Sequence, residues 1–423
     1  MDHAAIASQD LFLSEDLRVR FVDVAEASRE LCFVTFDSFN DLGTLARPAF
    51  AEGFLLSRGI PAIHILSRRN LWYQEPELPD ALAAARAIAG GYGRVIAYGS
   101  SMGGFAAIRF GAEAGAGAAI AISPQFSIDP DEVDFEPRWA KSASHIRFLG
   151  WRRDAPRVGR VYVFYDPFDL DGQHVSRIAA HYPTTRIRLP YAGHPAGGYF
   201  NETGFLPAAI ESIASDSLDA PAFERAARAI RHRSGQYLFN MARRLPMRRK
   251  ETKHALARRA VAANTRDPVN RSFLAMVLDQ MGAWTEAEAE HRAALATEPD
   301  NPHFLERYAR FLLRHGRLAE AEPLSGQAYG IAPQIPFVAR TRGLILLAQG
   351  RSGDGLRVLE RISRVYPEHL TRLIPDALRV AVWRGLHLIG LGRRSKPAIP
   401  IPFGAELAWR RQRGRRERAA AGE

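Results

Sequence analysis

A serine stands in a glycine-rich turn with the spacing G-x-S-x-G, formed by Gly99, Ser101 and Gly103. An apolar, β-branched run over 95–98 precedes the turn, and an alanine-rich segment with helical spacing follows it. A strand, a tight turn and a helix in this order would push the Ser101 hydroxyl out above the edge of a sheet. The free N–H groups at the start of the helix would then stabilise negative charge beside that hydroxyl. These residues predict a nucleophilic serine rather than a plain glycine-rich turn.

Two polar clusters follow later apolar runs and contain the other groups that an activated serine needs. Asp169 and Asp171 come after one such run, and His194 comes after the next. His194 could take the proton from the Ser101 hydroxyl and later return it to a leaving group, while a carboxylate orients the imidazole. The chain order is serine, acid, histidine, which differs from the orders in enzymes of the chymotrypsin and subtilisin types.

The elements that must position these residues alternate between strand and helix over the first half of the chain. The predicted strands cover residues 11–13, 19–24, 31–36, 62–66, 95–98, 118–122, 161–165 and 185–189. Strands that alternate with helices form βαβ units, so the predicted fold class is α/β, with a mainly parallel sheet flanked by helices. Ligands bind such sheets at the carboxyl ends of the strands. Ser101 and both polar clusters lie at such ends, so we expect them to meet at one edge of the sheet.

The order of serine, acid and histidine, together with the turn at Ser101, resembles the α/β-hydrolase superfamily over about residues 10–217. The motifs GSSMGGFAA, SPQFSID, RNLWYQ, YDP and AGHP are similar to a group of bacterial α/β-hydrolase proteins, some of them encoded near surface-polysaccharide genes. The resemblance implies a serine hydrolase that acts on a carboxylic ester or thioester through a Ser-His-Asp triad. Acyl transfer to a sugar hydroxyl uses the same groups and is an alternative.

The resemblance also indicates where the acid of the triad stands. Members of the superfamily often place it about four residues after its strand, which favours Asp169 if the strand ends at Tyr165. Asp171 is the alternative acid, because it is also close enough to His194. It could instead cap the next helix.

Two backbone N–H groups are expected to bind the oxyanion: that of Met102, and one near Asp37 or Ser38 in the loop after the strand 31–36. This loop has no HGGG-type motif, which argues against a classical lipase of that type. Four residues are expected to form walls of the substrate pocket, namely Trp72, Tyr73, Gln125 and Phe126. For the pair at 72–73, packing on the sheet edge is the alternative.

Glycines, prolines and small residues recur every 34 residues in the second half of the chain, at Gly282, Gly316 and Gly350, at Pro299, Pro333 and Pro367, and at Ala287, Ala321 and Gly355. A period of 34 is that of the tetratricopeptide repeat, in which each unit is two antiparallel helices. The glycine turns the chain, the small residue lets the helices approach, and the proline ends the second helix. The pattern predicts an all-α helical solenoid that binds a protein partner. Arg342 takes an apolar position, so the third unit is expected to be atypical.

Changes in composition divide the chain into four segments. The α/β-hydrolase domain is expected over 1–217 and ends at a stretch rich in Ser, Asp and Pro. A basic helical linker over 218–252 follows it, and then repeats with a capping helix over 253–392. A basic tail over 393–423 completes the chain.

The net charge of +11 is concentrated in two basic clusters, at 225–250 and 393–418. Aromatic residues are not interleaved with them as they are in grooves that bind single-stranded nucleic acid. A solvated surface is therefore favoured over contact with an anionic surface, which remains the alternative.

The sequence also argues against several classes of protein. It has no apolar run of 18 or more residues, so no transmembrane helix is expected, and its start lacks the pattern of a signal peptide. Cys32 is the one cysteine, which excludes an internal disulfide and fits a reducing cytoplasm. No metal-ligand spacing and no phosphate-binding Gly-Lys-Ser/Thr loop occurs, so no metal or cofactor is expected.

A non-catalytic scaffold is the main alternative to an enzyme. In that case the repeats bind a partner, and the hydrolase-like domain is a structural or binding module. The presence of serine, acid and histidine in the superfamily's order favours the enzyme.

Overall fold

The computed structural model describes residues 6–24, 27–40, 42–148 and 155–365, together with 375–378, 380–381 and 384. It divides the chain into two compact units, Met1–Asn264 and Thr265–Glu423. The expected basic tail lies outside the described residues, as does most of the capping helix expected over 378–391.

An eight-stranded sheet forms the core of the first unit, with the strand order β1-β2-β4-β3-β5-β6-β7-β8. β2 runs antiparallel to β1 and β4, and the other neighbouring strands are parallel. The strands are β1 (Ile6–Leu13), β2 (Leu17–Val24), β3 (Leu31–Phe36), β4 (Ala62–Ser67), β5 (Arg94–Ser100), β6 (Ala118–Ile122), β7 (Arg160–Tyr165) and β8 (Thr184–Arg188). The central strands are almost continuous apolar runs, as in sheets that are covered on both faces. The predicted α/β class with a mainly parallel sheet is confirmed.

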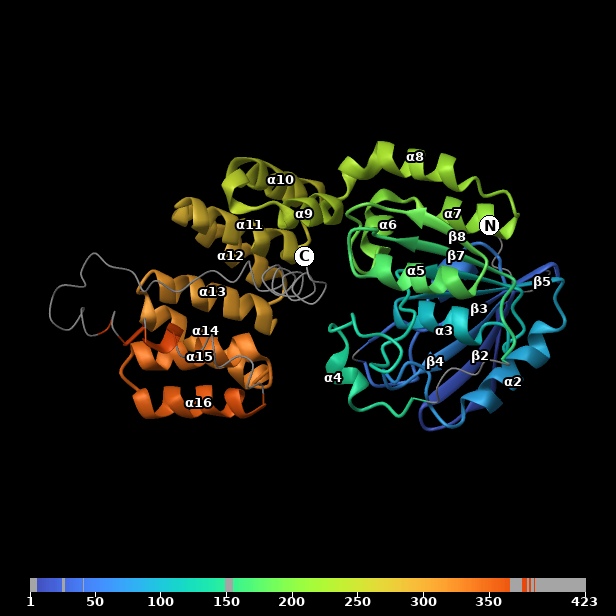
Figure 1. Cartoon of the computed structure of the whole chain (residues 1–423), viewed down its shortest axis with the longest axis horizontal. Coiled ribbons are helices and arrows are strands. Elements are labelled where there is room, and N and C mark those ends of the chain that lie inside the picture. Colours follow the sequence, from blue (N-terminus) through green and yellow to red (C-terminus); the bar gives the residue numbers. More distant parts are fainter. Residues whose placement is uncertain are drawn as a thin grey trace, which may run out of the picture. The chain divides into compact units, whose positions relative to one another are not determined.

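Helices cover both faces of this sheet (Figure 1). They are α1 (Glu52–Leu56), α2 (Leu78–Ala89), α3 (Met102–Phe110), α4 (Ala140–Ala143), α5 (Asp171–His181), α6 (Gly197–Thr203) and α7 (Leu206–Ala214). Neighbouring residues of β7 show the two layers, because successive side chains of a strand point to opposite faces. Val163 belongs to the same apolar cluster as residues of α2, α3 and α5. Phe164 contacts Phe200 of α6, with ring centroids 5.4 Å apart.

Residues 218–264 belong to the first compact unit, whereas the sequence predicts a domain boundary near residue 217. They form α8 (Ala220–Ile230), α9 (Gly235–Arg244) and α10 (Lys250–Ala263), with short 3₁₀ turns before α9 and α10. α8 packs on the sheet, because its Phe223 lies against Phe164 with ring centroids 5.7 Å apart. The basic residues of this segment lie mainly on exposed faces of its helices. The amino-acid composition is therefore basic, although one side of the segment is apolar and buried. The segment predicted as a basic helical linker therefore packs within the first compact unit.

Up to residue 365, the described part of the second unit contains three helix pairs: α11 (Pro268–Met281) with α12 (Trp284–Thr297), α13 (Pro302–Arg314) with α14 (Leu318–Ile331), and α15 (Pro336–Ala348) with α16 (Ser352–Val365). The chain turns within each pair at a glycine with positive φ, namely Gly282, Gly316 and Gly350. Ala287 and Ala321 are fully buried where paired helices cross. This arrangement confirms the predicted solenoid. Arg342 binds Glu322 of the preceding helix at 2.9 Å, which satisfies its charge at an otherwise apolar position.

None of the helices among the described residues is long and apolar enough to cross a membrane.

β5 and α3 pass so close to each other that no side chain fits between them. A Cβ on Gly99 would overlap the carbonyl oxygen of Gly103, and a Cβ on Gly103 would overlap the carbonyl oxygen of Phe36. The obstructing atoms belong to the backbone, so a change of rotamer cannot relieve the overlap. Gly99 therefore sets the distance between β5 and α3, and Gly103 sets the distance between α3 and the end of β3. Together they fix the position of the turn at Ser101.

The loop between β4 and α2 buries a carboxyl group. Glu75 is fully buried; its Oε1 accepts a hydrogen bond from the Ser67 hydroxyl at 2.9 Å, and its Oε2 has no partner. Burial raises the pKa of Glu75 to about 7. The folded chain thus holds a proton on Glu75 in a pH range where the unfolded chain has lost it.

The Gly99→Ala substitution is expected to lower the free energy of unfolding by about 1–3 kcal/mol, as overpacking of a close contact does. Urea unfolding followed by circular dichroism measures the change. Gly117→Ala is the matched control, because a Cβ there meets nothing within 4 Å. The control is expected to change stability by no more than about 0.5 kcal/mol. Equal unfolding midpoints for the two variants would contradict the steric argument.

The Glu75→Gln substitution is expected to remove a pH dependence of stability. Because the folded pKa lies above the unfolded one, wild-type stability should fall as the pH rises from about 4.5 to about 7, by an amount of up to about 3 kcal/mol. Urea unfolding of both proteins at pH 5 and pH 8 tests this. The exposed Glu251→Gln serves as control. A Glu75→Gln variant with the same pH dependence as the wild type would refute the assignment.

Candidate active site

Ser101 is the single residue between the end of β5 and the start of α3. Its backbone has φ 52° and ψ −114°, an unfavourable conformation for a residue with a side chain. Two hydrogen bonds hold it there: its N–H donates to the carbonyl of Ile122 at 2.8 Å, and its carbonyl accepts from the N–H of Phe105 at 2.9 Å. The strained turn is thus tied to β6 on one side and to α3 on the other.

His194 connects the Ser101 hydroxyl to a carboxylate. Its Nε2 lies 3.0 Å from Oγ of Ser101, and its Nδ1 lies 3.0 Å from each carboxyl oxygen of Asp171. An ionised carboxylate accepts only, so Nδ1 carries the proton and Nε2 is left to accept from the serine hydroxyl. Asp171 is fully buried in the first turn of α5, where its side chain caps no amide. The structure therefore brings Ser101, His194 and Asp171 together.

Asp169, the acid preferred from the sequence, does not contact His194 in this way. Its Oδ1 accepts the N–H of Leu170 at 2.7 Å, and its Oδ2 lies 3.3 Å from the guanidinium of Arg244. Burial opposes ionisation of Asp169, but the Leu170 amide and nearby arginines outweigh it and lower the pKa of this carboxyl. The sequence favours Asp169, whereas the geometry places Asp171 at the imidazole and Asp169 at the arginines.

The two expected oxyanion donors lie at different kinds of position. Met102 opens α3, so its N–H belongs to the first helical turn, which has no intrahelical acceptor. The N–H of Asp37 donates to the carbonyl of Ile65 at 3.4 Å and is engaged in the sheet. Ser38 lies next to it, and its hydroxyl donates to the carbonyl of Ser100 at 3.0 Å, which anchors this loop beside the turn. Between the two expected loop positions, the geometry favours the N–H of Ser38.

Gln125 contacts the serine directly. Its Nε2 donates to Oγ of Ser101 at 3.1 Å, while its Oε1 has no hydrogen-bond partner although the side chain is buried. Since Oγ also faces His194, the Ser101 hydroxyl accepts from Gln125 and donates to the imidazole. This expected wall residue therefore adjoins the nucleophile.

The other three expected wall residues have different neighbours within one apolar cluster. Tyr73 is fully buried, packs edge-on against Phe36, and donates to backbone carbonyls through its hydroxyl. Trp72 is also fully buried and packs against Trp139 with ring centroids 5.1 Å apart. The ring of Phe126 stacks on His181 in the last turn of α5. Tyr73 thus packs at the ends of β3 and β4.

Trp139 is an aromatic neighbour of the site that the sequence did not point to. Its ring lies 6.3 Å from the imidazole of His194 and 5.1 Å from the ring of Phe39, measured between centroids. It comes from the irregular stretch between β6 and β7, which has no periodicity from which its position could be inferred.

A buried charge network behind Asp171 was also missed. Arg138 donates to Asp171 at 3.0 Å and to both carboxyl oxygens of Glu136. Glu136 also accepts from Nε2 of His174 at 2.8 Å. Burial opposes ionisation of Glu136, but the bonds from His174 and Arg138 outweigh it and lower its pKa to about 2. Burial lowers the pKa of His174, as expected for a structural histidine that is kept neutral. The only sign of this network in the sequence is that Glu136 and Arg138 are two residues apart. That spacing alone does not predict a buried ion pair.

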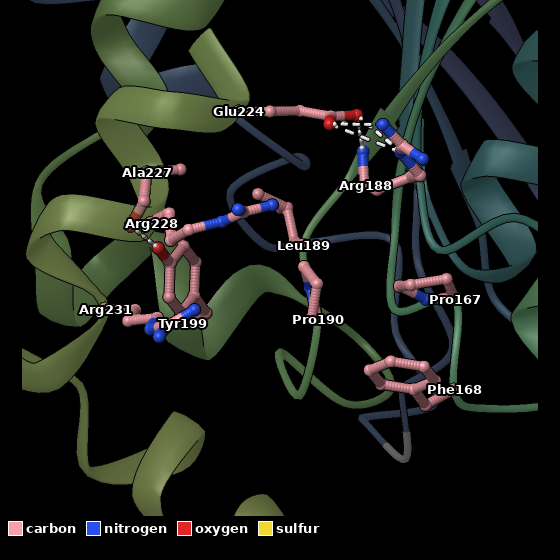
Figure 2. A pocket seen from close by; sticks show the side chains of 10 residues that line it. All are labelled: Pro167, Phe168, Arg188, Leu189, Pro190, Tyr199, Glu224, Ala227, Arg228 and Arg231. Atoms are coloured by element: carbon pink, nitrogen blue, oxygen red, sulfur yellow. Dashed lines mark hydrogen bonds and ion pairs between the residues drawn. The ribbon is translucent and has the colours of Figure 1, made fainter. Parts of the chain in front are cut away.

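A cavity of about 270 Å³ lies after the ends of β7 and β8 and is lined by none of the four expected wall residues. Figure 2 shows its charged edge, where Arg188 is bonded to Glu224. The lining also includes Phe168, Tyr199 and the arginines at 228 and 231. Among the residues described, no group of three or more His, Cys, Asp or Glu side chains is placed to hold a metal ion.

The comparisons with known proteins concern each unit separately. Residues 280–328 match the family model of the tetratricopeptide repeat. No curated protein matches the sequence. Among solved structures, a dienelactone hydrolase from Anabaena variabilis is 17% identical with a TM-score of 0.34, and the match covers 50% of this chain and 96% of that one. An esterase from Pyrococcus furiosus is 14% identical with a TM-score of 0.32, covering 51% and 91%.

The tetratricopeptide repeat protein YrrB, whose structure is described as having an unusual peptide-binding site, is 15% identical with a TM-score of 0.31, covering 42% of this chain and 90% of that one. The fold is assigned from the structure of this chain and not from these matches. The structure has the sheet's strand order, the strained turn at Ser101 and the helix pairs. On these features, the chain joins an α/β-hydrolase fold to tetratricopeptide repeats.

Proposed function

We propose that the protein is a serine hydrolase of the esterase or thioesterase type. The observation that carries the proposal is the hydrogen-bond chain from Ser101 through His194 to Asp171, which starts at a strained turn on the first residue before a helix. A structural serine needs neither the strained backbone nor an imidazole whose other nitrogen faces a buried carboxylate. The acid in this proposal is Asp171, in place of Asp169.

The first half of the reaction forms an acyl-enzyme. Oγ of Ser101 attacks the acyl carbonyl, and Nε2 of His194 takes the hydroxyl proton. The N–H groups of Met102 and Ser38 are the proposed donors to the oxyanion. His194 then gives its proton to the leaving alcohol or thiol as the carbon–oxygen or carbon–sulfur bond breaks. Water repeats the sequence in the second half, which releases the acid and restores the Ser101 hydroxyl.

Asp171 orients the imidazole and stabilises its protonated form, and Arg138 shares this carboxylate. The guanidinium is a partner for the buried Asp171, because an unpaired charge at such a site is costly. It also draws on the same negative charge that stabilises protonated His194. The arrangement therefore fixes the position of the carboxylate that orients the imidazole.

The second unit is proposed to bind a protein partner. Support comes from the match of residues 280–328 to the tetratricopeptide repeat, since stacked helix pairs of this kind present extended surfaces for binding. In this proposal the hydrolase acts beside, or on, a molecule that the repeats recruit.

Ser101→Ala is expected to abolish labelling of the full-length protein by a fluorophosphonate probe, which reacts with activated serines. Gel fluorescence and mass spectrometry of the labelled peptide measure the outcome. Ser176→Ala, which changes an exposed serine of α5, is the control and is expected to label like the wild type. A wild-type protein that is not labelled, and that turns over no member of an ester and thioester panel, would indicate a non-catalytic scaffold.

Asp171→Asn is expected to reduce kcat for an activated acetyl ester by about 10³-fold or more, because the amide no longer selects the proton position of His194. Asp169→Asn is expected to cost far less, since this carboxylate faces Arg244 and not the imidazole. Steady-state kinetics of both variants decide between the acids. A larger loss for Asp169→Asn than for Asp171→Asn would return the assignment to Asp169.

A further inference from the structure

Three polar residues of α9 are spaced four apart, at Gln236, Asn240 and Arg244. Residues four apart lie on one face of a helix, so these side chains form a single stripe. The stripe contacts the loop that carries His194 and the turn that follows β7. We name these three residues the α9 stripe.

The first two residues of the α9 stripe hold the loop on either side of His194. Nε2 of Gln236 donates to the carbonyl of Ala192 and, at 3.0 Å, to the carbonyl of Pro195. Asn240 is buried against Gly193, where an added Cβ would overlap its side-chain nitrogen. Gly193 also has φ 76°, so a larger residue would be strained there. The loop can take this position because Gly193 leaves room for Asn240.

Arg244 ties the same loop to the carboxylates after β7. Its guanidinium lies 3.1 Å from Asp166 and 3.3 Å from Asp169, and above the ring of Tyr191. The same oxygen of Asp166, which is fully buried, accepts the N–H of Gly193 at 3.1 Å. Asp166 thus links Arg244 to Gly193, the residue before His194.

A second path runs from Arg244 toward the carboxylate of the site. Asp169 lies 3.7 Å from Arg138, and Arg138 lies 3.0 Å from Asp171. One arginine of α9 therefore adjoins both the histidine loop and the charge network behind the acid. No such double contact is made by the other two residues of the stripe.

α9 is itself firmly anchored in the first unit. The Ser234 hydroxyl caps the helix by accepting the N–H of Tyr237 at 3.0 Å. One carboxyl oxygen of Glu202, in α6, accepts from the Ser234 hydroxyl at 2.6 Å and from the N–H of Gln236 at 2.9 Å. A helix fixed in this way can hold a loop in one position, as a supporting layer around a site must do.

We propose that α9 is a positioning element of the active site, in which Gln236, Asn240 and Arg244 hold His194 and Asp171 in the geometry that the reaction needs. The inference rests on the proposed function, since it assigns a role relative to that triad. The contacts of the three side chains are with the loop around His194 and with Asp166 and Asp169, not with Ser101. They act through the loop at His194 and through the carboxylates after β7. Their loss should therefore lower the rate at which Ser101 reacts, while the fraction of molecules that can react stays the same.

The test is the rate of fluorophosphonate labelling of the full-length protein. Arg244→Met is expected to lower the rate constant at least about tenfold, because small displacements of catalytic groups cost that much or more. The labelled fraction at the end of the reaction should stay that of the wild type. Arg244→Lys should regain part of the rate, since lysine keeps the charge but cannot bridge Asp166 and Asp169 with a planar fork. Arg248→Met, at an exposed arginine just past α9, is the matched control and should label like the wild type.

The amplitude separates a positioning role from a structural one. A variant that is merely unstable would lose labelled fraction, while its folded molecules would react at the wild-type rate. Either that result or a wild-type rate with full labelling in Arg244→Met would overturn the inference. If Arg244→Met does not fold, Gln236→Met decides, because this side chain is half-buried and its loss is expected to slow labelling in the same way. A wild-type protein without labelling at Ser101 would instead refute the proposed function, and this inference with it.

Discussion

The close passage of β5 and α3 is the constraint on which the candidate site depends. Glycine at 99 lets the backbones of β5 and α3 meet, and glycine at 103 lets α3 approach the end of β3, so one residue must make the whole turn between β5 and α3. That residue is Ser101, and its unfavourable φ follows from packing rather than from its own preference. A conformation of this kind costs on the order of 1–3 kcal/mol, which the hydrogen bonds to Ile122 and Phe105 help to offset. The hydroxyl and the first helical N–H are thereby fixed beside each other.

Around this turn, the main electrostatic problem is the crowding of carboxylates after β7. Asp166, Asp169 and Asp171 fall within one short stretch; Asp166 and Asp171 are fully buried, and Asp169 is partly buried. Carboxylates in such a place need partners for their charges. Arg138 and Arg244 divide them: one arginine faces Asp171 and the other faces Asp166, while Asp169 lies between both. The division leaves Asp171 as the carboxylate that meets the imidazole. Side chains remote from Asp171 in the sequence thus decide which acid stands at His194.

The sequence was sufficient to predict the features that depend on local pattern. The strand, turn and helix around Ser101, the alternation of strands and helices, and the period of the repeats all follow from neighbours in the chain. The choice between Asp169 and Asp171 does not, because it depends on arginines from the irregular stretch before β7 and from α9. Counting residues after β7 favoured Asp169 although the end of the strand was placed correctly at Tyr165.

The position of residues 218–264 could not be inferred from composition for a related reason. The many arginines of this segment suggested a solvated connector, whereas its packing depends on a few apolar residues on one face. Phe223 and Ala227 are four apart and buried, which is the spacing of a helix that covers a core. Tyr73 is a similar case, because nothing in its neighbours indicates that its hydroxyl is used inside the sheet.

The contact between Phe223 and Phe164 has a consequence for how the two units could be separated or recombined. A cut at residue 217 would strip α8 from β7 and leave a phenylalanine of the central sheet facing water. The natural joint of the chain is instead between Asn264 and Thr265. One repeat array could be exchanged for another, by evolution or by engineering. The hydrolase fold would be preserved only if α8, α9 and α10 stayed attached to the sheet domain.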